Sequence, residues 1–140
     1  MFRKISWVVI IGLLLGMTTA MASDSEKENA AVASAEKWLT LVDEGKYVES
    51  WMEASEYFKQ NIGKDTWEQA AQGVRKPLGK LVSRKILSAS YKTSLPGAPD
   101  GEYVVIEFDT SFENKKSGVE TVTPKMEKDG VWRVSGYYIR

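Results

Sequence analysis

The stretch "EYVVIEFDTSF" (residues 102–112) decides the fold class, because its apolar side chains recur at every second position. Val104 and Phe108 would point to one face of a β-strand, whereas Glu107 and Asp109 would point to the other. A strand with one apolar and one polar face is typical of an antiparallel sheet that is covered on one side only. We therefore expect a half-buried antiparallel sheet.

Strand and turn signals continue on both sides of this stretch. Upstream, "SRKILSASYK" (83–92) has strand character and precedes the turn "LPGAPDG" (95–101). Downstream, the turn "ENKKSG" (113–118) precedes the strand "VETVTPKME" (119–127), and the turn "KDG" (128–130) leads to the last strand. Strands joined by short turns in this way predict a four-stranded antiparallel meander.

The polarity of the last hairpin fixes its register. A two-residue turn would place Trp132 opposite Glu127, whereas a three-residue loop (128–130) places Trp132 opposite Met126. Only the three-residue loop keeps the apolar residues together, and it puts Gly130 where a left-handed residue is needed. In this register we expect Trp132, Val134, Gly136 and Tyr138 to face the helices, and Arg133, Ser135 and Tyr137 to lie on the opposite face.

Helical periodicity precedes the strands. Apolar residues recur at helical spacing from 30 to 44, a second short helix is expected in "YVESWMEAS" (47–55), and a third from "DTWE" (65–68) to just before Pro77. Helices followed by an antiparallel meander give an α+β domain, in which N-terminal helices pack on a bent four-stranded antiparallel sheet.

The N-terminus has the layout of a secretory signal peptide. The basic residues Arg3 and Lys4 precede a short apolar stretch and small residues, with cleavage expected after Ala22. The alternative is an uncleaved N-terminal anchor. The apolar stretch is shorter than the roughly 20 residues that a helix needs to span a bilayer, which favours cleavage over an anchor. Residues 23–29 would then be a flexible leader, and residues 30–140 a single domain. We expect a periplasmic or secreted protein without stable membrane insertion.

Charge and residue types exclude several classes of function. The chain has 19 basic and 19 acidic residues, and loss of Arg3 and Lys4 leaves a slight acidic excess, so we exclude nucleic-acid binding as a main function. The chain has no His and no Cys, which excludes thiol nucleophiles, Ser-His triads, imidazole bases and the ordinary zinc sites. We therefore expect no metal and no cofactor, and an enzyme would have to use Asp, Glu, Tyr, Lys or Arg.

Aromatic residues provide the first candidate binding site. If the bent sheet leaves an open mouth beneath the helices, aromatic side chains of the helices and of the covered sheet face would line an apolar pocket. The alternative is that they simply fill the core. The candidate pocket-lining residues are Trp38, Trp51, Tyr57, Phe58, Trp67, Phe108, Trp132 and Tyr138.

Charged residues provide candidate polar sites. Arg75 and Arg84 flank the junction between helices and sheet and could bind an anion, with ordinary solvated charges as the alternative. Glu107 and Asp109 share a strand face, and paired carboxylates catalyse acid–base chemistry when burial raises the pKa of one of them. The alternative is that they are solvent-face residues that pair across strands with Lys or Arg. Arg133 is a further candidate on the uncovered face, which could also bind a partner.

Four blocks of the chain, in this order, resemble a bacterial exported family known as domain of unknown function 4019. They are "AEKWLTLVDEGKYVESW" (35–51), "RKPLGKLVSRKIL" (75–87), "LPGAPDGEYVVIEFDTSF" (95–112) and "DGVWRVSGYYIR" (129–140). The resemblance implies a small exported domain without an assigned activity. The order of elements is also similar to the nuclear-transport-factor-2-like (cystatin-like) cone, whose members include ligand-binding proteins, isomerases, dehydratases and association modules.

These expectations favour a non-catalytic exported domain that binds a small apolar ligand or a protein partner. Two alternatives stay open. One is a lyase or isomerase that uses a carboxylate and a Tyr on a hydrophobic substrate. The other is a module that forms a homodimer through the uncovered face of the sheet. Catalysis is thus undecided, although the missing His and Cys argue against it.

Overall fold

The computed structural model describes Gly16 and residues 21–140. The elements are α1 (Asp24–Asp43), α2 (Tyr47–Glu53), α3 (Glu56–Asn61), α4 (Lys64–Leu78), β1 (Leu81–Lys92), β2 (Tyr103–Phe112), β3 (Lys115–Met126) and β4 (Trp132–Ile139). Helices precede strands, which confirms the α+β class. The signal peptide predicted for residues 1–22 lies almost wholly outside the described residues. Within the described part, no helix is both long and apolar enough to span a bilayer.

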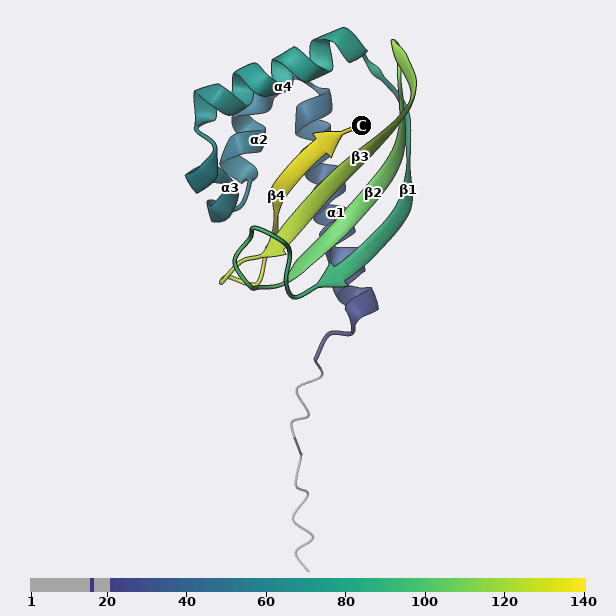
Figure 1. Cartoon of the computed structure of the whole chain (residues 1–140). Coiled ribbons are helices and arrows are strands. Elements are labelled where there is room, and N and C mark those ends of the chain that lie inside the picture. Colours follow the sequence, from purple (N-terminus) through teal and green to yellow (C-terminus); the bar gives the residue numbers. More distant parts are fainter. Residues whose placement is uncertain (1–15, 17–20) are drawn as a thin grey trace, which may run out of the picture.

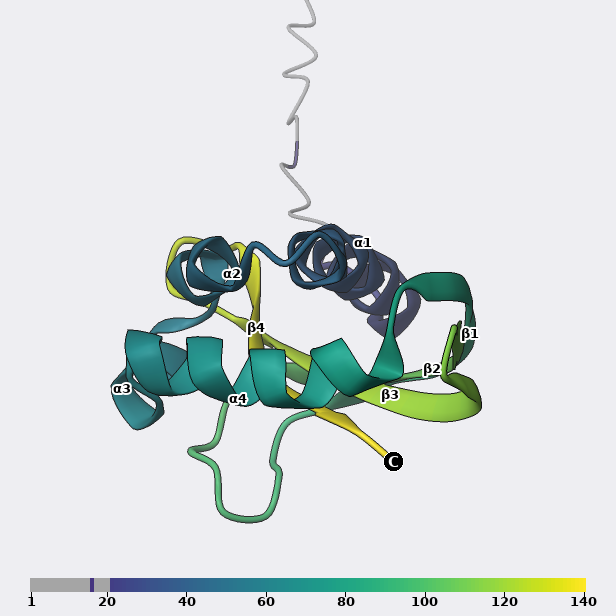
Figure 2. The ribbon, with the colours of Figure 1, turned by 90° about the horizontal axis from the view of Figure 1, so that it is seen from above.

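The strands form one antiparallel sheet in the order β1-β2-β3-β4, as the meander predicts. The sheet is twisted and curls around α1 (Figure 1). Figure 2 shows α1 and α2 on one side of the sheet, while the connection between β1 and β2 extends on the other side. We call the side that packs against the helices the inner face and the other side the open face.

β2 has the polarity that its sequence predicts. Val104, Ile106 and Phe108 are buried on the inner face, in one apolar core with residues of α1. Glu107 and Asp109 lie on the open face and are only partly buried. The backbone of β2 is hydrogen-bonded to a neighbouring strand on each side. The two faces of β2 therefore differ in the burial of their side chains.

α1 begins earlier than its apolar periodicity indicates. Ser23 caps the helix by accepting a hydrogen bond from a backbone N–H of the first turn. The segment 23–29, expected to be a flexible leader, therefore forms the cap and first turns of α1. Contacts with the sheet hold these turns in place, because the Lys27 ammonium lies 3.0 Å from the Glu102 carboxylate and 4.6 Å from the centre of the Tyr91 ring. No local pattern reveals such contacts.

α4 continues to Leu78 and so includes Pro77, which was expected to follow the helix. Proline has no N–H to donate to the carbonyl four residues earlier, and the helix ends one residue after it. Gly79 then turns the chain with a φ of 76° and donates its N–H to the carbonyls of Arg75 and Lys76. The glycine, rather than the proline, terminates the helix.

The last hairpin has the expected loop and register. Trp132 lies opposite Met126, and Val134 lies opposite Pro124. Gly130 has a φ of 80°, in the left-handed region that the three-residue loop requires. Trp132 and Val134 are buried on the inner face, as predicted.

A β-bulge at Ser135 interrupts the alternation of β4. The register passes from Val134 opposite Pro124 to Gly136 opposite Thr123, so Ser135 is an additional residue on β4. Pro124 has no N–H to donate to a neighbouring strand, and prolines within sheets are confined to edges and bulges. This proline is the sequence signal for the bulge.

The bulge exchanges the faces of all residues that follow it. Ser135 is held by a 2.6 Å hydrogen bond between its hydroxyl and that of Ser55. Tyr137 then faces the helices and Tyr138 the open face, where Gly136 also lies. Strict alternation predicted the opposite placement of these three residues and was wrong, because it allowed for no extra residue.

Candidate functional site

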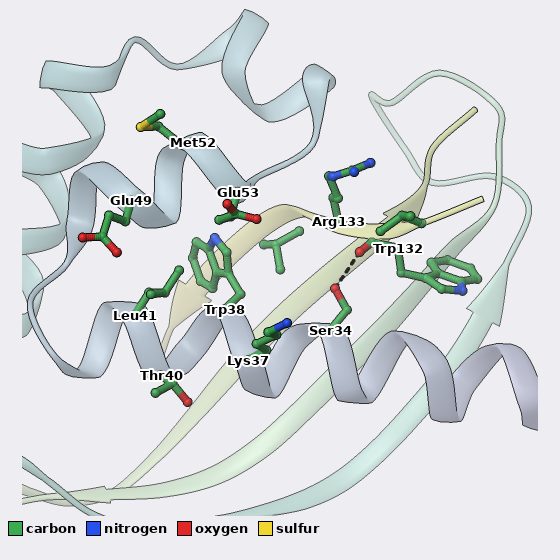
Figure 3. A pocket seen from close by; sticks show the side chains of 12 residues that line it. Ser34, Lys37, Trp38, Thr40, Leu41, Glu49, Met52, Glu53, Trp132 and Arg133 are labelled. Atoms are coloured by element: carbon green, nitrogen blue, oxygen red, sulfur yellow. Dashed lines mark hydrogen bonds between the residues drawn. The ribbon is translucent and has the colours of Figure 1, made fainter. Parts of the chain in front are cut away.

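A groove of about 630 Å³ opens between α1, α2 and the beginning of β4 (Figure 3). This volume lies within the roughly 300–1,000 Å³ that is usual for small-molecule sites. The groove is lined by Ser34, Lys37, Trp38, Thr40 and Leu41 of α1, by Glu49, Met52 and Glu53 of α2, and by Val131, Trp132, Arg133 and Val134 of the last hairpin.

Two hydrogen bonds fix the helices against β4. The hydroxyl of Ser34 donates to the carbonyl of Trp132 at 2.6 Å, and the backbone N–H of Ser55 donates to the carbonyl of Val134 at 2.9 Å. Both carbonyls belong to an edge strand of the sheet. Because they already accept hydrogen bonds, this part of β4 does not offer the free ladder that an added strand would need.

The surface of the groove is largely apolar. Trp38 and Trp132 are almost fully buried beneath it, whereas Met52 and Val131 at its sides are 60% and 45% exposed. The indole N–H of Trp38 donates to the carbonyl of Ser50 at 2.8 Å, so the ring is fixed and its polar atom is satisfied. A ligand that covered the exposed side chains would remove apolar surface from water.

Charges around the groove are unevenly paired. Arg133 donates two hydrogen bonds to Asp129, at 3.0 and 2.9 Å, and these bonds raise the pKa of its guanidinium. Three side chains of the groove form no ion pair. Among the described residues, no oppositely charged group lies within 4.0 Å of Lys37, Glu49 or Glu53. The α2 wall is therefore acidic, and the α1 wall carries one free cation.

The structure divides the predicted aromatic pocket between groove and core. Trp38 and Trp132 belong to the buried core and also line the groove, whereas Phe58, Trp67 and Phe108 belong to the core but do not line the groove. The ring centre of Trp67 lies 5.0 Å from that of Phe58 and 5.7 Å from that of Trp38. These rings fill the space beneath the helices, which is the expected result if the aromatic residues simply form the core.

The other predicted pocket residues lie elsewhere. Trp51 packs at the edge of the core and donates its indole N–H to the carbonyl of Ile62 at 2.7 Å. The hydroxyl of Tyr57 donates to the carbonyl of Gly97 at 3.3 Å. Tyr138 is 57% exposed on the open face, so its predicted place in the pocket was wrong because of the bulge.

Arg75 and Arg84 do come together, but around carboxylates of the protein rather than in an open anion site. Arg84 donates to both carboxylate oxygens of Asp43, at 2.7 and 2.9 Å, and to Glu120 at 2.7 Å. Arg75 donates to Asp43 at 2.7 Å. The side chains of Asp43 and Glu120 therefore take the positions that an external anion would occupy.

Glu120 is fully buried at the centre of this cluster. Besides Arg84, it accepts hydrogen bonds from the hydroxyls of Thr110 and Tyr137, both at 2.5 Å. A buried carboxylate is tolerated only when it is paired and hydrogen-bonded in this way. The cluster joins the end of α1 to α4 and to the inner face of the sheet. We call Asp43, Arg75, Arg84, Glu120 and Tyr137 the inner network.

The environment of the inner network shifts two pKa values in opposite directions. Burial alone would raise the pKa of Asp43, but the hydrogen bonds and positive charges of Arg84 and Arg75 outweigh it and lower that pKa. Burial, together with the charge of Glu120, raises the pKa of Tyr137. Asp43 is thus ionised and Tyr137 neutral at pH 7, which is the state that their hydrogen bonds require.

A second hollow, of about 330 Å³, lies beside Arg75. Its lining residues are Val42, Asp43, Tyr47, Arg75, Lys76, Gly79, Lys80 and Glu113. Nε and Nη1 of Arg75 are buried without hydrogen-bond partners, and the guanidinium lies 4.8 Å from the centre of the Phe112 ring. Cation–π attraction offsets part of the cost of the missing hydrogen bonds. With few apolar residues in its lining, this hollow is a weaker site for an apolar ligand than the groove.

Glu107 and Asp109 lie on the open face, as predicted, and each lies near a cation. Glu107 is 3.4 Å from Arg140, the residue after β4, and Asp109 is 3.7 Å from Lys85, its register partner on β1. These are the cross-strand pairs that the sequence offered as the alternative to catalysis. Neither carboxylate lines the groove.

Within the described residues, no group of three or more Asp or Glu side chains is arranged to hold a metal ion. The chain supplies no His or Cys ligand. The buried carboxylates Asp43 and Glu120 are already bound by arginines. The residues that the structure describes therefore present no metal centre.

The sequence patterns did not indicate Glu120 as a site residue and placed Tyr137 on the open face, although a signal for the buried carboxylate exists. Glu120 precedes Val122 by two residues, so it occupies an inner-face position in β3. Arg75 follows Trp67 at helical spacing and shares the buried side of α4. A charged residue in phase with apolar ones indicates a buried ionic contact. For Tyr137 the signal was the proline that causes the bulge.

Comparison with known families agrees with the resemblance of the sequence blocks. Residues 34–137 match the family described as protein of unknown function (DUF4019). The matched segment includes α2, α3, α4, the strands β1 to β3 and most of β4. Among curated proteins, none matches the chain. Since the match covers well over half of the chain, the protein belongs to the DUF4019 family of proteins of unknown function.

Proposed function

We propose that this protein is a non-catalytic binding domain that holds a small apolar ligand in the groove between α1 and α2. The observation that carries the proposal is the groove itself, with its volume of about 630 Å³ and with Trp38 and Trp132 in its lining. Met52 and Val131 expose apolar surface at its sides, and covering such surface is the main driving force for binding small apolar molecules.

The placement of carboxylates and tyrosines supports a role without catalysis. The groove contains Glu49 and Glu53 but no Tyr, so a mechanism that needs a carboxylate and a Tyr lacks one of its groups there. The buried pair of Glu120 and Tyr137 lines neither of the two hollows, and its hydrogen bonds give it a structural role. Export, the cone fold and dimerisation through the open face stay predictions.

Native mass spectrometry tests whether the protein carries a ligand. Protein exported by cells that express the full-length chain would be purified without denaturant and weighed before and after denaturation. We expect a mass excess that disappears on denaturation and gives the mass of the ligand. If the native protein has no excess mass, titration with an apolar dye decides whether the groove binds a ligand.

A neutral apolar dye, N-phenyl-1-naphthylamine, tests the groove directly by fluorescence titration. We expect saturable binding that Met52→Gln weakens several-fold, because a polar side chain replaces part of the apolar wall. Val74→Gln is the matched control, since Val74 is a 49% exposed apolar residue on α4, away from the groove. Absence of dye binding by the unaltered protein, or equal weakening by both substitutions, would overturn the proposed function.

A further inference from the structure

We infer that the groove selects apolar molecules that carry a positively charged amine, such as a single alkyl chain with an ammonium head. This inference rests on the proposed function and deepens it by naming the class of ligand. It follows from the hydrogen-bonding groups, the charges and the dimensions of the groove.

The neutral polar side chains of the groove are already engaged within the protein. Ser34 donates to the carbonyl of Trp132, Thr40 donates to the carbonyl of Glu36, and the indole N–H of Trp38 donates to Ser50. A ligand rich in hydroxyl or amide groups would find few partners here and would lose its hydrogen bonds to water. The side chains that remain free to interact are apolar or charged.

The free charges favour a cation on the α2 side. Glu49 and Glu53 lie one helical turn apart on α2, and both border the groove (Figure 3). Arg133 does not neutralise them fully, because Asp129 binds both of its terminal nitrogens. Among the residues that the structure describes, Lys37 is the one unpaired cation that borders the groove, and it lies on the opposite helix. An ammonium group beside the two glutamates complements this arrangement.

The dimensions favour a small amphiphile over a peptide strand. The groove-lining residues of α1 run from Ser34 to Leu41, about two turns or roughly 10 Å. The carbonyls of Trp132 and Val134 already accept hydrogen bonds from Ser34 and Ser55, so the part of β4 beside the groove is a poor template for an added peptide strand. An alkyl chain has no backbone polar groups to satisfy and can lie over Trp38, Leu41 and Met52.

The test compares three amphiphiles with the same decyl chain, each below its micelle concentration. Decyltrimethylammonium is cationic, decyl maltoside is neutral and decanoate is anionic. Binding would be measured by calorimetry at low ionic strength and pH 7. We expect the cationic amphiphile to bind about tenfold more tightly than the anionic one, and this preference to shrink at high salt.

Variants locate the preference. Glu49→Gln combined with Glu53→Gln should remove most of the discrimination between the cationic and the anionic amphiphile. Glu36→Gln combined with Glu44→Gln is the matched control, because it changes net charge equally at two exposed glutamates outside the groove. We expect this control to keep the discrimination.

The outcomes separate the inference from the proposed function. Equal affinity for all three amphiphiles, weakened by Met52→Gln, would leave the proposed function intact and overturn the inference. Discrimination that persists in the Glu49 and Glu53 variant, or that the control variant removes equally, would also overturn it. Failure of every amphiphile to bind would overturn both.

Discussion

The two faces of the sheet carry ionic contacts between the same residue types in opposite settings. On the inner face, Arg84 binds Asp43 and the fully buried Glu120 at 2.7 Å. On the open face, Glu107 lies 3.4 Å from Arg140, and both side chains are substantially exposed. The inner contacts are short and form a network, whereas the contacts of Glu107 and Asp109 are longer and separate from each other.

This difference shows that burial, rather than residue type, sets the energetic role of an ionic contact. An exposed pair contributes at most about 1 kcal/mol, because water and salt screen it. Removal of one partner of a buried pair leaves an uncompensated charge and costs about 3–5 kcal/mol. The inner network therefore holds α1, α4 and the sheet together, whereas the exposed pairs contribute little to stability.

The largest predicted difference is between Glu120→Gln and Glu107→Gln, which make the same chemical change on the two faces. Glu120→Gln should lower the free energy of unfolding by about 3–5 kcal/mol, because Arg84 loses a buried partner. Glu107→Gln should lower it by less than about 1 kcal/mol. Urea unfolding followed by tryptophan fluorescence measures both. Equal losses would contradict the assignment of the two faces.

Neighbouring tyrosines on β4 test the bulge at Ser135. Tyr137→Ala should destabilise the fold by about 3 kcal/mol or more, since it removes a ring packed 5.3 Å from that of Trp38. Tyr138→Ala should cost less than about 1 kcal/mol, because its side chain lies on the open face. Thermal unfolding would show the difference. A larger loss of stability for Tyr138→Ala than for Tyr137→Ala would mean that β4 alternates strictly and has no bulge.

The lowered pKa of Asp43 predicts a pH-dependent difference between the faces. A depressed pKa gives stability above the usual value near 4, and this stability is lost as the pH falls through the lower pKa of the folded protein. Asp43→Asn should therefore cost up to about 3 kcal/mol at pH 7 and progressively less below pH 4. Asp109→Asn serves as the open-face control. Unfolding curves between pH 2 and 7 would measure this loss of stability. A loss of the same size at every pH would contradict the prediction.

The smallest predicted effect concerns the hydroxyl of Tyr137. Tyr137→Phe should cost about 1.5 kcal/mol at pH 7, because it removes one hydrogen bond to the buried carboxylate of Glu120. The raised pKa of Tyr137 means that its contribution is present below the usual value near 10 and is lost as the pH rises through the higher pKa of the folded protein. The gap between the two proteins should narrow above pH 10 in unfolding measurements. A gap that widened would reject the role assigned to the hydroxyl.

Regular patterns in the sequence were sufficient for much of the fold. Alternation in 102–112 predicted β2 and its two faces, and the polarity of the last hairpin predicted that Trp132 pairs with Met126. Both predictions held because they depend on neighbours along one strand or one hairpin. Alternation failed at Ser135 because a bulge depends on the partner strand, where Pro124 cannot donate a hydrogen bond.

The candidate site was predicted less well, because it depends on contacts between distant segments. Trp38 and Trp132 were among the predicted pocket residues, but Lys37, Glu49 and Met52 were not, although they line the groove. Their sequence pattern is that of ordinary surface residues of helices. Only the packing of α2 beside α1 and β4 brings them to the same hollow.

The sequence by itself determined the class of fold, the register of the last hairpin and the exclusion of His and Cys chemistry, since composition and short-range periodicity suffice for these. Tertiary structure alone decided that Arg75 and Arg84 meet Asp43, that Tyr137 turns inward, and that the open space is a groove beside the helices. The physical reason is that such contacts join residues tens of positions apart, and their energies depend on burial, which no local pattern specifies.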